Sequence, residues 1–597
     1  MELQARHRLS RSLTPVALSL VTLTLFLATS IVGATPIETD AGMVDFPERL
    51  IPEPPVGLDK AAAAEAMAVL VRADYAAASK LEELERWNLE RRKPVQTGFV
   101  RPLGSTATID FGSDKAGQPG VFSKVDGATV WSARVEIERA HRVRLHLAEI
   151  DVPEGTQLWV RGGAELVAFD TSLRSPAGDL WTPSIGGGSI ELIVELPAGD
   201  HPTALLRIDA IAEIFRLDPT GVPVFDADSA EKDSHCLEDG ACYGTNDLAG
   251  YDIYQEAVSN LNFVDGGQTF SCSGTLVNDD DGSSFIPYLL TANHCFSTQA
   301  VASTLEAYFD DIALSCGNMD WPDLASLPRV NGSTLLATSF GTDSTFVQLA
   351  NNPSGPTGFM GWSTAVVGTN TALYRLSHPM GLSQHFSTYL TVNPFIPCNG
   401  VSTSSFIYSE PTLGATAGGS SGASLVDGNI RIRGQLLGAC GPDPEDICNP
   451  DNDDVDGRFA NFFDQISGFL LTDGGGGTGG CTADENTLCM LNGRFRVTGT
   501  WRDFENEVGP FEVTPVDLGD RGGAFHFFSA NNPEVFVKVI DGCTFNGHFW
   551  FFAAGLTNLE TVMTVVDTET NSTQTYTNTI GQAAPAITDT EAFATCP

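Results

Sequence analysis

Residue types that together catalyse acyl transfer stand on two β-like segments in the middle of the sequence. His294 closes the apolar segment 289–295, and Asp343 opens the alternating segment 341–349. A carboxylate in that place can accept a hydrogen bond from an imidazole Nδ1 and orient the ring as a general base. Each residue alone is more often structural, because a single histidine is usually structural and an aspartate before a strand usually belongs to a turn.

A serine for such a base lies in the stretch G-A-T-A-G-G-S-S-G-A-S-L, residues 414–425. By composition this stretch resembles the glycine-rich run at 473–480, so it is either a spacer or a nucleophile loop. In a loop, the glycines would allow a tight turn that exposes Ser421, and the N–H groups of Gly419 and Ser421 would form an oxyanion hole. The chain order His, Asp, Ser favours the loop.

Residues 236–471 resemble chymotrypsin-like serine endopeptidases, and most closely the bacterial lysyl endopeptidases. The order His, Asp, Ser is the order found in the chymotrypsin class. The segments that carry the resemblance are S-C-S-G-T-L-V-N (271–278), T-A-N-H-C (291–295), the segment headed by Asp343, G-S-S-G-A-S (419–424), G-Q-L-L-G-A (434–439) and G-R-F-A (457–460).

The resemblance implies a mainly β protease domain of two barrels with the site between them. It implies that His294 is the general base, Asp343 its orienter and Ser421 the nucleophile, so that peptide bonds are hydrolysed through an acyl-enzyme. It also places Leu436 and Gly438 on the strand that pairs with the substrate backbone.

The acidic run before Gly457 has two interpretations. Asp454 stands at roughly the position of the family's specificity carboxylate, which implies cleavage after Lys, or after Lys and Arg. The alternate residues Asn452, Asp454 and Asp456 also fit the start of a Ca²⁺ loop, although Phe463 stands where such a loop ends in glutamate. We therefore expect a substrate pocket and keep calcium as the alternative, with no other cofactor or metal.

The twelve cysteines all lie at or beyond Cys236 and form no C-x-x-C pair, which favours disulfides over metal ligands. The resemblance implies the pairs Cys272 with Cys295, Cys242 with Cys316, and Cys236 with Cys448 or Cys440, with Cys398 joined to the remaining one. Proximity and elimination favour Cys481 with Cys489 and Cys543 with Cys596 in the tail.

The N-terminal third reads as export and folding segments. Residues 1–34 combine three arginines, an apolar run and a small-residue site, which is typical of a signal peptide. Residues 35–232 look like the proregion of the bacterial family. Within them, 58–92 predicts one long helix or a helical pair, 97–216 a cysteine-free β-sandwich, and 217–232 an exposed connector.

The protease domain is expected over 233–471, followed by a glycine-rich linker at 472–480 and an accessory β-sandwich-like domain at 481–597. Ser420 stands where many animal relatives have the aspartate that pairs with a new N-terminal amine, so activation here does not use that ion pair. A lysine-specific enzyme could instead cut after Lys232. Residues 233–537 contain no lysine, so that such an enzyme would resist its own cleavage.

The net charge of −42 excludes nucleic acid as a partner, because phosphate binding needs a basic face. We expect a secreted serine endopeptidase of the lysyl type that acts as a monomer on protein or peptide substrates. Its proregion would serve as intramolecular inhibitor and folding assistant, and the mature chain would not bind membranes. The alternative is a non-catalytic binding or adhesion protein on a protease scaffold.

Overall fold

The computed structural model describes residues 36–596 apart from 49–68, 74–77, 225–235, 318–322, 395–397, 472–480, 503–510 and further gaps of one or two residues. The predicted signal peptide, the predicted cut after Lys232 and the predicted glycine-rich linker therefore lie outside the described residues. Within the described residues, no helix is both long and apolar enough to cross a membrane.

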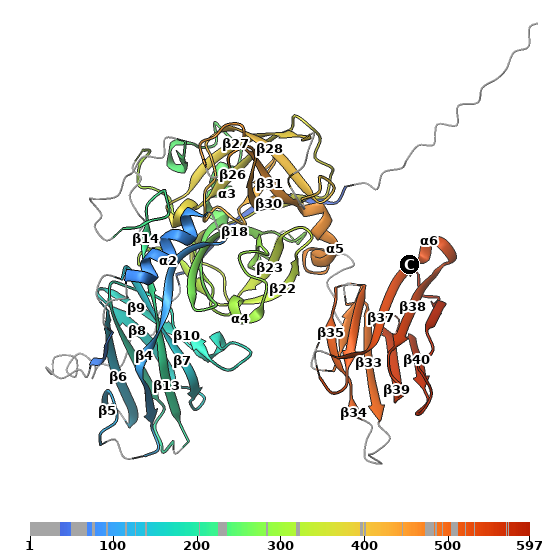
Figure 1. The fold of residues 1–597 in the computed structure, drawn as a ribbon, viewed down its shortest axis with the longest axis horizontal. Coiled ribbons are helices and arrows are strands. Elements are labelled where there is room, and N and C mark those ends of the chain that lie inside the picture. Colours follow the sequence, from blue (N-terminus) through green and yellow to red (C-terminus); the bar gives the residue numbers. More distant parts are fainter. Residues whose placement is uncertain are drawn as a thin grey trace, which may run out of the picture. The chain divides into compact units, whose positions relative to one another are not determined.

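The first domain is a β-sandwich built from two sheets, as the alternating segments predict (Figure 1). Its outer sheet comprises β3 (Val69–Ala73), β6 (Ala128–Ile137), β12 (Ser189–Leu196), β8 (Gln157–Gly162) and β9 (Glu165–Phe169), with β5 (Val121–Val125) beside β6. The facing sheet comprises β10 (Leu180–Trp181), β7 (Arg142–Asp151), β13 (Leu205–Ile214) and β4 (Val95–Asp110), with β11 (Ile185–Gly186) beside β7. A short hairpin of β14 (Arg216–Leu217) and β15 (Pro223–Val224) follows.

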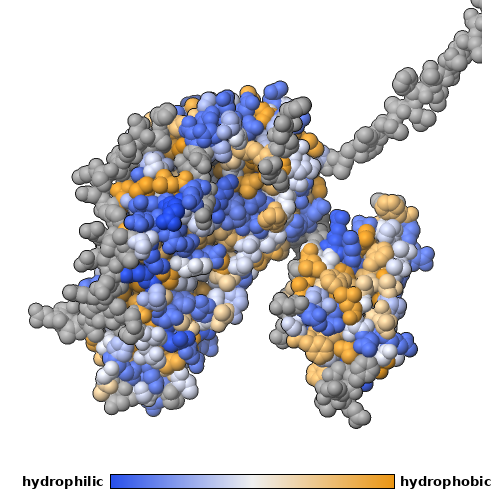
Figure 2. All heavy atoms as spheres, in the orientation of Figure 1, coloured by the Kyte–Doolittle hydropathy of each residue, from blue (hydrophilic) through white to orange (hydrophobic). Residues whose placement is uncertain are grey.

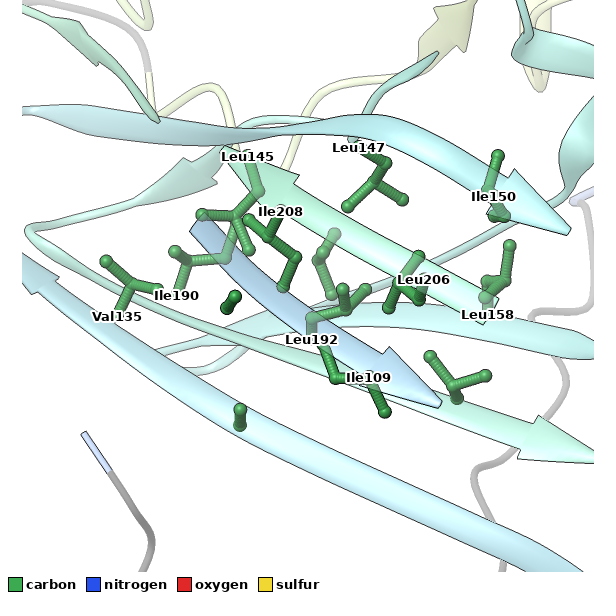
Figure 3. Close-up of a cluster of buried hydrophobic side chains, with 14 of the residues drawn as sticks. Ile109, Val135, Leu145, Leu147, Ile150, Leu158, Ile190, Leu192, Leu206 and Ile208 are labelled. Atoms are coloured by element: carbon green, nitrogen blue, oxygen red, sulfur yellow. The ribbon is translucent and has the colours of Figure 1, made fainter. Parts of the chain in front are cut away.

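The core of this sandwich consists of the apolar residues that alternate along its strands. Ile109, Val135, Leu145 and Leu192 are fully buried and lie among one another in Figure 3. Along each strand the core residues are two positions apart and so lie on one face. Each sheet therefore buries a hydrophobic surface against the other.

Strand β4 belongs to two domains at once. Its residues 98–110 pair with β13 of the sandwich, and its first residues, 95–99, pair antiparallel with β18 (Gln268–Val277) of the central domain. Helix α2 (Ala78–Leu89) precedes this strand and contacts it. The sheet of the sandwich is therefore continuous with the first barrel of the central domain.

The first barrel of the central domain is a half-barrel. Its strands are β17 (Val258–Asp265), β18, β19 (Tyr288–Ala292), β20 (Glu306–Tyr308), β21 (Arg329–Asn331), β22 (Ser333–Ser339) and β23 (Ser344–Leu349). The short helices α3 (Tyr251–Ala257) and α4 (Gln299–Ala302) flank it, and a hydrophobic cluster that includes Leu261, Leu289 and Val347 fills it.

The second barrel closes on itself because β30 pairs with β29 on one side and with β31 on the other. Its strands in order are β30 (Arg431–Cys440), β29 (Ser424–Val426), β26 (Ala372–Ser377), β27 (His385–Val392), β28 (Phe406–Leu413) and β31 (Asp453–Arg458). The two-residue strand β16 (Glu238–Asp239) pairs with β27, and helix α5 (Phe459–Leu470) follows β31. The predicted chymotrypsin-like double-barrel fold is confirmed.

The first described strands do not join the sandwich but the central domain. β1 (Glu38–Thr39) pairs with β25 (Gly361–Ser363), and β2 (Gly42–Phe46) pairs with β24 (Gly355–Phe359). Arg431 of the central domain forms ion pairs with Glu38 and Asp40. The segment before the sandwich is therefore bound to the central domain at a place separate from β4.

The C-terminal domain is a second, smaller sandwich with two five-stranded sheets. One holds β32 (Leu488–Met490), β33 (Phe495–Arg502), β39 (Glu560–Asp567), β40 (Ser572–Asn578) and β34 (Phe511–Glu512). The other holds β35 (Thr514–Asp517), β36 (Gly522–His526), β37 (Pro533–Gly542), β38 (His548–Gly555) and β41 (Ile587–Phe593), with helix α6 (Cys543–Asn546) between β37 and β38. Large apolar side chains such as Phe528, Phe545 and Leu556 are exposed on this domain, which shows many hydrophobic atoms in Figure 2.

The helix predicted over 58–92 is wrong in part. Residues 78–89 are helical, but Val69–Ala73 forms strand β3, which pairs parallel with β6. Val69 and Val71 are β-branched and lose side-chain freedom in a helix, and the strand that pairs with them lies about sixty residues further along the chain. Residues 58–68 and 74–77 of the predicted helix lie outside the described part of the chain.

Candidate active site

Asp343 and His294 are joined by two hydrogen bonds. His294 Nδ1 lies 2.7 Å from Asp343 Oδ2, and the backbone N–H of His294 donates to Asp343 Oδ1 at 2.9 Å. His294 lies in the turn after β19, and Asp343 directly precedes β23. Because β19 and β23 are neighbouring antiparallel strands, the two residues come together where these strands end.

Asp343 is held by its own backbone as well as by its carboxylate. Its φ of 51° lies in the left-handed region, which aspartate tolerates better than most residues. Its carbonyl accepts hydrogen bonds from the N–H of Asn293 at 2.9 Å and from Gln435 Nε2 at 2.8 Å. Gln435 is fully buried on β30 of the other barrel and also donates to Thr342 O, so it fixes the acid across the barrel boundary.

Gly457, on β31 of the second barrel, lies directly against the backbone of Thr342, the residue before Asp343. A Cβ atom on Gly457 would lie 1.8 Å from Thr342 O and 2.6 Å from Gln435 Nε2. Real Cβ atoms do not approach a carbonyl oxygen so closely, so only glycine allows this approach of backbone to backbone.

Ser421 lies in a loop that two glycines shape. Gly419 and Gly422 have φ values of 93° and 83°. A Cβ on Gly422 would lie 2.2 Å from Thr291 Oγ1, and one on Gly419 would lie 2.6 Å from His378 O. The carbonyl of Ser421 accepts a hydrogen bond from Ser273 N at 2.8 Å, which binds this loop to β18. The loop is therefore a built turn and not a spacer.

Two N–H groups of this loop are available to a ligand. Gly422 N donates to Leu436 O and Ser420 N to Ala417 O, whereas the N–H groups of Gly419 and Ser421 donate to none of the described residues. His294 Nε2 likewise has no hydrogen-bond partner among the described residues. An oxyanion hole needs N–H groups without a partner in the protein, and a general base needs a ring nitrogen without one.

Disulfides fix the segments around this site. The described chain contains the pairs Cys236–Cys448, Cys242–Cys316, Cys272–Cys295, Cys398–Cys440, Cys481–Cys489 and Cys543–Cys596. These include the pairs that the resemblance implies, and Cys448 takes Cys236 while Cys440 takes Cys398. Cys272–Cys295 ties the residue after His294 to β18, and so restrains the histidine turn.

A cavity of about 320 Å³ adjoins Ser421. Leu436 and Gly438, the residues expected to bind substrate backbone, line it together with Thr416 and Gly418. The cavity therefore lies between the serine loop and strand β30, beside the nucleophile candidate.

Asp454 is separated from this cavity by Thr416. The hydroxyl of Thr416 lies 3.1 and 3.2 Å from the two carboxylate oxygens of Asp454. Asp454 also accepts a hydrogen bond from Arg375 Nη1 at 2.7 Å, while Arg375 Nη2 binds Asp456 at 2.5 Å. The sequence interpretation missed Arg375, a lone charge in the otherwise uncharged strand A-L-Y-R-L-S, which signals a buried partner.

The charges behind the cavity do not balance. Arg375 is fully buried and contributes one positive charge against the carboxylates of Asp454 and Asp456, so the cluster has a surplus of one negative charge when both are ionised. Burial raises the pKa of Asp456, an effect that Arg375 partly offsets. A buried surplus charge favours a counter-ion, and a cationic side chain in the cavity would supply it.

The three residues of the calcium alternative bind other groups in this structure, and the alternative stays a prediction. Asp454 and Asp456 bind Arg375, and the side chain of Asn452 bonds with the backbone of residues 443 and 446. The three side chains do not converge, and the part of the chain that the structure describes holds no group of three or more His, Cys, Asp or Glu residues suited to a metal ion.

The family described as Lysyl endopeptidase, C-terminal domain, matches residues 230–453 of the chain. This segment covers the first barrel and the second barrel up to the start of β31, and it includes His294, Asp343 and Ser421. The segment is a serine protease domain. It ends one residue before Asp454, so the match does not include that residue.

Solved structures of bacterial proteases are also similar to part of the chain. The active form of the Rv3671c protease from M. tuberculosis is 11% identical, with a TM-score of 0.26, and the match covers 37% of this chain and 84% of that one. The serine endoprotease from Yersinia pestis is 12% identical, with a TM-score of 0.26, over 38% of this chain and 67% of that one.

Proposed function

We propose that the protein is a secreted serine endopeptidase that hydrolyses peptide bonds on the carboxyl side of lysine, or of lysine and arginine. The observation that carries the proposal is the double hydrogen bond from His294 to Asp343, on a serine protease domain whose Ser421 lies in a glycine-bounded loop. Acyl transfer needs a histidine base that is oriented in this way by a carboxylate.

In this mechanism, Ser421 Oγ attacks the carbonyl carbon of the substrate while His294 Nε2 takes the hydroxyl proton. Asp343 keeps the proton on Nδ1 and stabilises the imidazolium that forms. The N–H groups of Gly419 and Ser421 bind the oxyanion. His294 then donates its proton to the leaving amine, and water hydrolyses the acyl-enzyme by the reverse sequence.

The cationic preference follows from the charges behind Thr416. A lysine side chain that enters the cavity brings one positive charge to a cluster that has one surplus negative charge when Asp454 and Asp456 are both ionised. Thr416 in the cavity wall bonds to Asp454. We expect lysine to be preferred, because its single point charge does not require the bidentate partner that an arginine needs.

The proposal is tested with a fluorophosphonate probe on the processed protein, followed by a cleavage profile on a peptide library. Covalent labelling at Ser421, lost in Ser421→Ala, together with cleavage after lysine supports the endopeptidase. Failure of the processed protein to label at Ser421 would instead support a binding protein on a protease scaffold. N-terminal sequencing of the exported form checks the signal peptide and the cut after Lys232.

A further inference from the structure

The sandwich domain sends one of its own residues to the candidate substrate cavity. Lys93 lines that cavity together with Ser421, and its Nζ donates a hydrogen bond to Leu437 O at 2.5 Å. A Cβ on Gly438 would lie 1.8 Å from this Nζ, so the ammonium group fills the space that the glycine leaves free. The residue as a whole remains exposed to solvent.

The ammonium group of Lys93 also lies within electrostatic reach of two carboxylates, those of Asp343 and Asp454. Desolvation lowers the pKa of Lys93, while the charges of Asp343 and Asp454 act in the opposite direction. Lys93 thus brings a positive charge towards the buried cluster that has a surplus of negative charge.

The residues that follow Lys93 continue through the site as an extended chain. Val95 pairs with Ser271 and Gln96 with Phe270, next to Cys272 and its disulfide to the histidine turn. On its other side, Val95 packs on the serine loop, because a Cβ on Gly418 would lie 3.2 Å from Val95 Cβ. The chain therefore runs between the serine loop and β18, as an extended substrate would.

Helix α2 fixes this segment in place. Trp87 Nε1 donates to Pro94 O at 2.9 Å, and the side chain of Asn88 exchanges two hydrogen bonds of 2.9 Å with the backbone of Gln96. Leu81 and Leu84 of the helix are buried in one cluster with Val95 and with Met380 of the protease domain. The segment is thus held by contacts that a passing substrate would lack.

The residue after Lys93 distinguishes it from the other lysines of the chain. The seven lysines are Lys60, Lys80, Lys93, Lys115, Lys124, Lys232 and Lys538, and Lys93 alone is followed by proline. The nitrogen of Pro94 has no N–H and its ring fixes φ, so the leaving side of this bond is crowded and differs from an ordinary amide.

We propose that Lys93 and Pro94 form a built-in, substrate-like inhibitor, in which Lys93 occupies the site of the residue on the acyl side of the cut bond and Pro94 prevents the cut. This inference rests on the proposed function and assigns its regulation to two residues. With Pro94 replaced by alanine, Ser421 Oγ would bond to the Lys93 carbonyl carbon, the bond from Lys93 to residue 94 would break, and the new amine would take the proton from His294.

The test uses the full chain with Lys232→Ala, so that the sandwich stays attached, and measures the rate at which a fluorophosphonate labels Ser421. Adding Lys93→Ala removes a charge-assisted hydrogen bond and should speed labelling at least about tenfold. Lys124→Ala, an exposed lysine on β5, is the matched control and should leave the rate unchanged.

The second measurement is the intact mass of the Pro94→Ala variant in the same background. We expect fragments that end at Lys93 and begin at residue 94, and we expect Ser421→Ala to abolish them. If Lys93→Ala labels no faster and Pro94→Ala stays intact, while processed wild-type enzyme labels and cleaves, the inhibitor assignment is wrong and the endopeptidase stands. If the cut wild-type enzyme does not label even after the N-terminal fragment has been removed from it, the proposed function itself fails.

Discussion

Asp343 contacts both the ring and the backbone of His294, with its two carboxylate oxygens 2.7 Å from Nδ1 and 2.9 Å from the backbone nitrogen. One carboxylate therefore fixes the tautomer of the imidazole and the turn that carries it. Neither contact involves Nε2, which stays free for proton transfer among the described residues.

Replacement of this acid should abolish catalysis without unfolding the site. In Asp343→Asn, the amide is similar in size to the carboxylate but favours the wrong tautomer, and we expect kcat to fall about 10³- to 10⁴-fold. The measurement is hydrolysis of a lysyl peptide by the processed enzyme. Unchanged kcat would contradict the role of Asp343, and a melting temperature equal to that of the parent controls for folding.

The carboxylate of Asp454 should affect which substrate side chain is preferred and not the catalytic step itself. Asp454→Asn removes the surplus negative charge while Arg375 keeps Asp456, so kcat/KM for a lysyl substrate should fall about 10- to 100-fold. A substrate with an uncharged side chain of equal length should lose much less. Asp451→Asn, at an exposed residue of the same acidic run, is the control, and a lysine preference that survives Asp454→Asn would exclude this pocket assignment.

The glycine between the barrels gives a stability prediction. Gly457→Ala would place a methyl group 1.8 Å from Thr342 O, and we expect a loss of roughly 1–3 kcal/mol in stability together with a loss of activity. Gly428→Ala is the matched control, because a Cβ there meets nothing within 4 Å. Thermal unfolding in a Ser421→Ala background avoids self-digestion, and equal melting temperatures for the two variants would refute the close approach.

A buried carboxyl group predicts how stability depends on pH. Burial raises the pKa of Asp311 to about 8, with a smaller contribution from Asp310, although Asn260 donates to it and His378 Nδ1 lies 3.5 Å away. In the unfolded chain, the carboxyl group of Asp311 has a pKa of about 3.9. Between pH ~4 and ~8 the folded state therefore keeps a proton that the unfolded state has released. Stability should fall as pH rises through that window.

Asp311→Asn removes the titrating carboxyl group, so the stability of the variant should fall less as the pH rises. Its melting temperature should exceed that of the parent at pH 8 but not at pH 4. Asp265→Asn, at an exposed aspartate, is the control and should not change the slope. A slope that is the same in Asp311→Asn and in the parent would show that Asp311 is ionised in the folded protein. The Ser421→Ala background serves for these measurements as well.

The sequence predicted the parts of the site that depend on local motifs. His294, Asp343 and the loop around Ser421 are recognisable because each combines a reactive residue with a turn or strand end, and their chain order connects them. The roles of Arg375 and Gln435 were not predicted, because each residue stands alone in a β-like run and its partner is distant in the sequence. Such contacts follow from barrel closure, which no local pattern encodes.

Non-local pairing also explains where the fold prediction failed. The segment 69–73 joins β6, and β4 divides its length between β13 and β18. Alternation predicts that such residues form strands, but the choice of neighbour depends on the whole sheet. The position of Lys93 in the cavity follows from that division and from helix α2, so it could not be read from the residues around Lys93 alone.

The pairing of β1 and β2 with β25 and β24 gives the protein a second attachment, on the opposite end of the N-terminal segment from β4. A cut between residues 224 and 236 would therefore turn an intramolecular contact into a two-chain complex without separating the chains. From then on, the fraction of protein with an open cavity would depend on total protein concentration, so that dilution would itself promote opening.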